Sequence, residues 1–173
     1  MNKRGGNKKG QVWIETVIYT MIAFVMIGLV LSYAKPAIEE KQDKAILEQS
    51  TELMKKIDST ILTIGSAGNK RVLDVLIKRG EFKINSTTDS LIFEMESKNI
   101  YTEPGISIKD GSLTILTTKK SDYHLVTLNL NYANRWNITY LDEDKDKSIS
   151  KSSTSYQIAI SNKGNDMLNF EVT

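Results

Sequence analysis

A run of almost purely apolar residues near the amino terminus constrains this chain more than any other feature. Residues 12–34 read VWIETVIYTMIAFVMIGLVLSYA, and as a helix they would span about 34 Å. The hydrocarbon core of a lipid bilayer is about 30 Å thick, so the run is long enough to cross it. The segment therefore predicts a membrane-spanning helix.

The ten residues before this run are basic and polar. They read MNKRGGNKKG and contain Lys3, Arg4, Lys8 and Lys9 without an acidic residue. Such a segment buries no apolar surface and is expected to be disordered. Positive charge in front of an apolar helix keeps the amino terminus in the cytoplasm and directs the rest of the chain outward.

Three interpretations of the first forty residues compete. A secretory signal peptide fits poorly, because the apolar run is too long and no small-x-small cleavage site follows it before Lys35 and Pro36. An uncleaved single-span anchor is the interpretation that hydropathy alone favours. In the third, the chain is cut in front of the apolar run, which stays attached as a core helix.

Glu15 favours the third interpretation. A carboxylate inside a membrane span costs roughly 2–3 kcal/mol when it has no partner, and a plain anchor gains nothing from that cost. A cut between Gly10 and Gln11 would create an ammonium group on Gln11, four residues before Glu15. Glu15 of one subunit would then pair with Gln11 of a neighbour and fix the axial register between them, which buried charge pairs do well.

The segment KGQVWIE, residues 9–15, carries a family resemblance. It resembles the class III signal peptide of archaeal type IV prepilins, in which a basic residue and glycine precede the cut and glutamate stands at mature position five. The resemblance implies cleavage after Gly10 by a membrane prepilin peptidase. It also implies assembly by a cytoplasmic ATPase and a platform membrane protein. Gln11 and the absence of cysteine favour an archaeal source over a bacterial one.

The helix is expected to continue beyond the apolar run, to about residue 64. Pro36 removes one backbone donor and should bend the helix locally, or less readily end it. Apolar residues then recur at helical spacing: Ile38, Leu47, Met54, Ile57, Ile61 and Ile64. Gly28 and Ser32 form a small-x-x-x-small pair, which is either a close helix contact or an incidental glycine.

After Gly68 the apolar period changes from that of a helix to two. Alternating runs occur around residues 73–77, 91–95, 126–132, 136–140, 156–160 and 168–172, and Asp110-Gly111 is a hairpin signal. About eight or nine short strands with one apolar face predict an antiparallel, immunoglobulin-like β-sandwich. The expected fold class is α+β, with a leader at 1–10, a core helix at 11–64 and a head at 65–173.

Two N-glycosylation sequons lie in the predicted head. Asn85 begins the sequence Asn-Ser-Thr in a polar turn, and Asn137 begins Asn-Ile-Thr within a predicted strand. The outward topology makes both accessible to a glycosylation machinery, and Asn85 is the stronger of the two.

The acidic segment DEDKDKS, residues 142–148, resembles the opening of a calcium loop. Asp142, Asp144 and Asp146 stand at alternate positions, as ligands of a hard cation do. Lys147 replaces the turn glycine of that pattern and Ser153 replaces its final glutamate. A solvated loop is therefore the preferred interpretation, and no other cofactor is expected.

Composition argues against several other functions. The net charge of +2 gives no argument for nucleic-acid binding. The chain has no cysteine and a single histidine, His124, which excludes disulfides, thiolate chemistry and a histidine-rich metal site. No nucleophile or phosphate-binding motif appears, so the chain is not expected to be an enzyme.

The sequence thus predicts a structural subunit of an extracellular archaeal filament. It would enter the cytoplasmic membrane as a precursor, polymerise with copies of itself through the apolar helix, and serve adhesion. The alternatives are an archaellin-type motility filament and an uncleaved, membrane-anchored β-sandwich that binds a partner.

Overall fold

One long helix and two β-sheets make up the protein. The structure, a computed structural model, describes the backbone of residues 8–173 and the side chains of residues 12–173. Helix α1 (Lys8–Leu62) runs through two compact units, Met1–Lys41 and Gln42–Thr173. We call the second unit the head. The predicted α+β fold class is confirmed.

Helix α1 continues through Pro36, as the expected helix over residues 11–64 requires. Pro36 lies inside α1, so the missing N–H interrupts one hydrogen bond without terminating the helix. The helix begins at Lys8, three residues before the expected start, and ends at Leu62, two residues before the expected end. Gly65, three residues after Leu62, has a φ of 78°, a conformation that favours glycine and prevents the helix from resuming.

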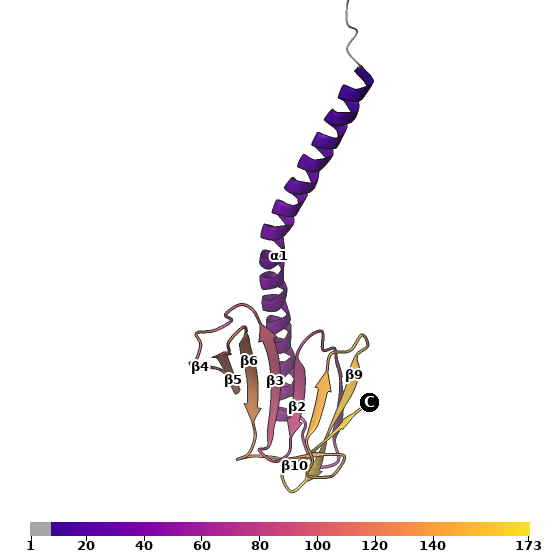
Figure 1. The fold of residues 1–173 in the computed structure, drawn as a ribbon. Coiled ribbons are helices and arrows are strands. Elements are labelled where there is room, and N and C mark those ends of the chain that lie inside the picture. Colours follow the sequence, from indigo (N-terminus) through magenta and orange to yellow (C-terminus); the bar gives the residue numbers. More distant parts are fainter. Residues whose placement is uncertain (1–7) are drawn as a thin grey trace, which may run out of the picture. The chain divides into compact units, whose positions relative to one another are not determined.

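Ten strands come after the helix in the described part of the chain. They are β1 (Lys70–Val75), β2 (Glu81–Asn85), β3 (Ser90–Ser97), β4 (Ser107–Asp110), β5 (Leu113–Lys119), β6 (His124–Asn131), β7 (Asn137–Tyr140), β8 (Lys147–Ser150), β9 (Tyr156–Gly164) and β10 (Met167–Val172). They form a four-stranded sheet in the order β1-β9-β10-β7 and a six-stranded sheet in the order β4-β5-β6-β3-β2-β8. Figure 1 shows both sheets.

The strand pairing is antiparallel with one exception. Strands β10 and β7 run parallel, pairing Met167 with Asn137 and Phe170 with Tyr140. Two of the ten strands, β2 and β8, were not expected from the sequence. They are short, and β8 carries a single buried apolar side chain, Ile149, so its alternation is too brief to stand out.

The core of the head lies between the sheets and the last turns of α1. Leu47, Met54, Ile57 and Ile61 of α1, and Ile64 just after it, are all at most 1 % exposed. They pack against the inward-facing residues of the strands, among them Phe82, Phe93, Leu128, Ile158 and Phe170. Ile38, which the pattern placed on the same stripe, is 53 % exposed and lies in the first unit. The apolar residues of α1 that pack on the sheets therefore begin at Ile46 and Leu47.

Two tight turns fix the register of neighbouring strands. Asp110 pairs with Leu113, so Gly111 and Ser112 form the two-residue loop between β4 and β5, with Gly111 at a φ of 65°. This confirms the hairpin expected at Asp110-Gly111, with the loop one residue further along. The turn between β9 and β10 is made by Asn165 and Asp166, both with positive φ, a conformation that these two residue types tolerate.

Candidate functional site

The most unusual surface of the protein is the first part of α1. Large apolar side chains point outward all around this segment, and each of them is between 39 % and 84 % exposed: Val12, Trp13, Ile14, Val17, Ile18, Tyr19, Met21, Ile22, Phe24, Val25, Met26, Ile27, Leu29, Val30, Leu31 and Tyr33. Isolated exposed apolar residues are ordinary, whereas a continuous set of this size marks contact with a membrane or with another protein. We call residues 12–34 the apolar segment.

The apolar segment meets the physical requirements of a nonaqueous environment. The helix is long and apolar enough to cross a membrane, and it is the single helix of that kind in the described part of the chain. Its backbone donors and acceptors pair within the helix, as a lipid environment demands. The hydroxyl of Thr16 donates to the carbonyl oxygen of Val12 at 2.9 Å, and that of Thr20 to the carbonyl oxygen of Thr16 at 2.7 Å. Its threonine hydroxyls are therefore also satisfied without water.

The residues of the predicted cleavage site lie at the start of α1. Gly10 and Gln11 are part of the helix, and their side chains lie outside the described residues, as do residues 1–7 of the predicted leader. Glu15 is exposed on the first full turn of the apolar segment. At Gly28 an added side chain would meet nothing within 4 Å inside the chain. Any constraint on the size of residue 28 therefore has to come from outside the chain.

Two buried aspartates attach α1 to the sheets of the head, and the sequence pattern did not single them out. Asp43 is 2 % exposed. It accepts a hydrogen bond from the hydroxyl of Ser97 at 2.8 Å and one from the backbone N–H of Lys98 at 3.3 Å, and it pairs with Arg79. A buried carboxylate with three donors is well compensated.

Asp58 is the second of these aspartates and lies about four turns further along α1. It accepts hydrogen bonds from the hydroxyl of Tyr132 at 2.7 Å and from the hydroxyl of Ser112. Burial of Tyr132, together with its hydrogen bond to Asp58, raises the pKa of the Tyr132 phenol above its ordinary value of 10.0. Asp43 precedes Leu47 by four residues and Asp58 comes four after Met54, so both aspartates lie on the buried face of the helix. This helical spacing is the signal by which the sequence could have identified them.

The two sequons have different surroundings. The side-chain oxygen of Asn85 accepts a hydrogen bond from the N–H of Thr88 at 2.9 Å, and Ser86 is 7 % exposed. Asn137 is exposed at the start of β7, while Thr139 is 3 % exposed. The expectation ranked Asn85 first, yet in the folded head Asn137 is the more accessible asparagine.

The acidic segment of the predicted calcium loop is engaged in contacts of the fold. Asp142 forms an ion pair with Lys163 at 2.8 Å, and Asp146 accepts a hydrogen bond from the N–H of Ser86 at 2.9 Å. Asp144 is exposed. Within residues 12–173 no three histidine, cysteine or acidic side chains form a group that could hold a metal ion.

A second charged cluster lies on the outer face of the six-stranded sheet. Lys83 forms ion pairs with Glu94 at 2.7 Å and with Glu81 at 3.3 Å. The hydrogen bond with Glu94 raises the pKa of Lys83 against the opposing effect of burial. A pocket of about 310 Å³ beside it is lined by Arg79, Glu81, Glu94 and Glu96. Three glutamates face one lysine here, and Arg79 is paired with Asp43, so the cluster carries a net negative charge.

No known protein family, curated protein sequence or solved structure matches this chain.

Proposed function

We propose that the protein is the structural subunit of an extracellular filament of the archaeal type IV pilus kind, which polymerises through its apolar segment. The observation that carries the proposal is the continuous exposed apolar surface of residues 12–33, in a chain whose head has a buried core of its own. Each large apolar side chain gains about 1.5–3 kcal/mol when it leaves water. A segment with so many of them requires lipid before assembly and apolar neighbours after it.

Copies of the same helix are the proposed neighbours in the filament. Helices in an apolar environment associate through small residues that let backbones approach, and Gly28 offers such a position on an unobstructed face. Glu15 gives the association an axial register, because its carboxylate pairs with the ammonium group that cleavage creates on Gln11 of another copy. This pairing explains why the apolar segment contains the charged residue Glu15, which a simple membrane anchor does not need.

The head carries the filament surface in this proposal. Its compact core and its buried polar contacts make it a rigid body that many copies can present side by side. We propose that these heads serve adhesion. The proposed function is structural, and the peptidase, the assembly ATPase and the platform protein are separate partners.

The identity of the mature amino terminus tests this proposal. Mass spectrometry of the protein recovered from a host with a prepilin peptidase should find Gln11, or its cyclised form, as the first residue. Electron micrographs of the same cells should show filaments. A mature chain that still begins at Met1 contradicts the proposal and assigns the protein to membrane-anchored β-sandwich proteins.

Substituting Glu15 tests the proposed register. Glu15→Ala should leave membrane insertion intact and lower the filament yield about tenfold or more, since loss of one buried charge partner costs several kcal/mol. Glu40→Ala, an exposed acid of the same helix beyond the apolar segment, is the matched control and should assemble normally. Filament yield is measured from sheared cell-surface fractions. An unchanged yield with Glu15→Ala would show that the register does not depend on this carboxylate.

A further inference from the structure

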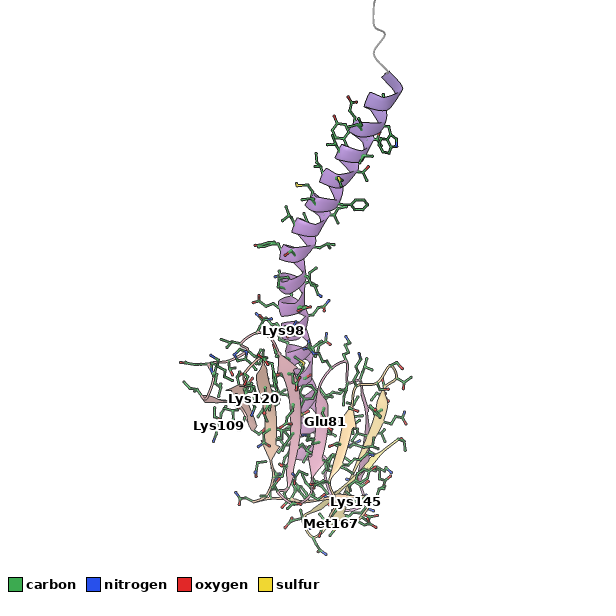
Figure 2. All side chains as sticks on the ribbon, in the orientation of Figure 1. Glu81, Lys98, Lys109, Lys120, Lys145 and Met167 are labelled. Carbon is green, nitrogen blue, oxygen red and sulfur yellow. The ribbon has the colours of Figure 1, made fainter. Side chains whose placement is uncertain are left out.

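A groove of about 260 Å³ lies between three turns of the head. The turns are the β2–β3 turn with Asp89, the β6–β7 connection with residues 133–136, and the β9–β10 turn with Asp166. Met167, directly after the last of these turns, marks this end of the head in Figure 2, opposite the end marked by Lys98. We call it the three-turn groove.

Hydrogen bonds from backbone N–H groups join the three turns to one another. The carbonyl oxygen of Asp89 accepts a hydrogen bond from the N–H of Tyr132 at 2.8 Å, and its carboxylate accepts one from the N–H of Ile138 at 2.8 Å. The carbonyl oxygen of Asp166 accepts one from the N–H of Asn137 at 2.7 Å. The walls of the groove are therefore fixed before any ligand arrives, which lowers the entropic cost of binding.

The lining of the groove combines hydrogen-bond donors, hydrogen-bond acceptors and an aromatic ring. Its polar side chains are two aspartates, two asparagines and one arginine: Asp89, Asp166, Asn134, Asn137 and Arg135. The guanidinium group of Arg135 lies 5.9 Å from the centre of the Trp136 ring. The indole N–H of Trp136 is buried, and no group of the described residues accepts a hydrogen bond from it.

This lining matches the chemistry of a sugar better than that of other ligands. Each hydroxyl of a sugar both donates and accepts a hydrogen bond, and asparagine, aspartate and arginine together offer both partners. Two aspartates against one arginine disfavour an anion. The groove volume of about 260 Å³ is large enough for one sugar ring.

We propose that the three-turn groove binds one neutral sugar unit. Trp136 packs against the sugar ring, and the surrounding polar side chains form hydrogen bonds with the sugar hydroxyls. Two sources of that sugar share this chemistry. One is a glycan on a foreign surface. The other is a glycan attached to Asn137, because this residue belongs both to the groove and to a sequon.

Tryptophan fluorescence tests the proposal, because the chain contains only two tryptophans, Trp13 and Trp136. In the full chain with Trp13→Phe, the emission reports on the groove alone. The protein is made in a host without N-glycosylation and kept in a zwitterionic detergent that has no sugar headgroup. Titration with glucose, galactose, mannose or N-acetylglucosamine should give a saturable change with a Kd of about a few millimolar for at least one of them.

Two variants locate the binding in the groove. Asn134→Ala and Arg135→Met should each raise the Kd about fivefold or more, because each removes hydrogen-bond donors from the lining. Asp122→Ala, in the turn between β5 and β6, lies outside the groove and should bind as the parent does. Equal weakening by all three variants would overturn the assignment to this groove.

A second experiment distinguishes a foreign glycan from a glycan attached to Asn137. The same chain is produced in an archaeal host, the Asn137 peptide is analysed by mass spectrometry, and the emission is compared with that of Asn137→Gln. Binding of free sugars to the glycan-free chain assigns a foreign glycan. A glycan on Asn137 that shifts the Trp136 emission, without binding of free sugars, assigns the chain's own glycan. No emission change in either experiment overturns the proposal, and neither experiment depends on filament assembly.

Discussion

Individual polar residues define how α1 sits on the sheets of the head. Apolar contacts are non-directional, so by themselves they specify the position of a helix on a sheet less sharply than hydrogen bonds do. Asp43 and Asp58 remove that freedom, since each has specific donors on the strands and turns that face it. Moving the helix by one turn would leave both carboxylates buried without hydrogen-bond donors, and a buried charged group without partners strongly destabilises the fold.

The pH dependence of stability should reveal the Tyr132–Asp58 hydrogen bond. The folded head raises the pKa of Tyr132 above 10.0, so the protonated phenol stabilises the fold fully below that pH and progressively less above it. At pH 8 Tyr132→Phe should lower the free energy of unfolding by about 2 kcal/mol. Between pH 10 and pH 11 the difference in the free energy of unfolding between Tyr132→Phe and the parent should shrink by about 1 kcal/mol. Urea unfolding at each pH measures it, and a difference that stays constant would contradict the assignment.

The sequence predicted the residues of the apolar stripe better than the residues that orient it. Leu47, Met54 and Ile57 follow from helical spacing alone, whereas the partners of Asp43 and Asp58 lie between 36 and 74 residues away along the chain. Such distant contacts leave no periodic signal. The three-turn groove escaped prediction for the same reason, since its residues come from three separate turns.

The long helix is one element that contains two kinds of surface. Up to Ala34 its side chains are apolar on all faces, and from Leu47 onward they are apolar on one face only. This change follows directly from the spacing of residues in the sequence, and the structure confirms it. Strand β8 illustrates the opposite case, because it has one buried apolar residue, Ile149, and its place depends on its pairing with β2.

Enlarging Gly28 tests whether helices approach closely along this face. Gly28→Leu favours the helix by about 1 kcal/mol and meets nothing inside the chain, so folding of the subunit should not suffer. If backbones of neighbouring helices meet at Gly28, the new side chain costs about 1–3 kcal/mol per contact, and filament yield should fall about tenfold. Ala23→Leu makes a comparable enlargement on a different face of the same helix and serves as the control. Equal yields for both variants would show that Gly28 is incidental.

At the scale of the whole molecule the two units have opposite solvent requirements. Residues 42–173 contain a closed core and a polar surface, whereas residues 12–34 expose apolar side chains throughout. The sequence predicted the α+β fold class, with a head expected from residue 65, whereas the second compact unit begins at Gln42. The sequence did not predict the parallel pairing of β7 and β10, because the chain between these strands passes through both sheets.

The head should therefore fold without the first unit. A chain of residues 42–173 should be monomeric and soluble without detergent, with a Tm within about 5 °C of that of the full chain in detergent. Analytical ultracentrifugation and circular dichroism measure the two properties. Aggregation of this chain, or loss of its strand signal, would show that the head depends on residues before Gln42.

The spacing of Asp43 and Asp58 has a mechanical consequence. The two carboxylates hold the helix to the sheets at points about 22 Å apart along the helix axis. A pull along that axis therefore loads both sets of hydrogen bonds in shear, and they must break together. A pull across the axis would break the hydrogen bonds of the two aspartates one after the other. The head is thus built to resist tension in the direction of its helix.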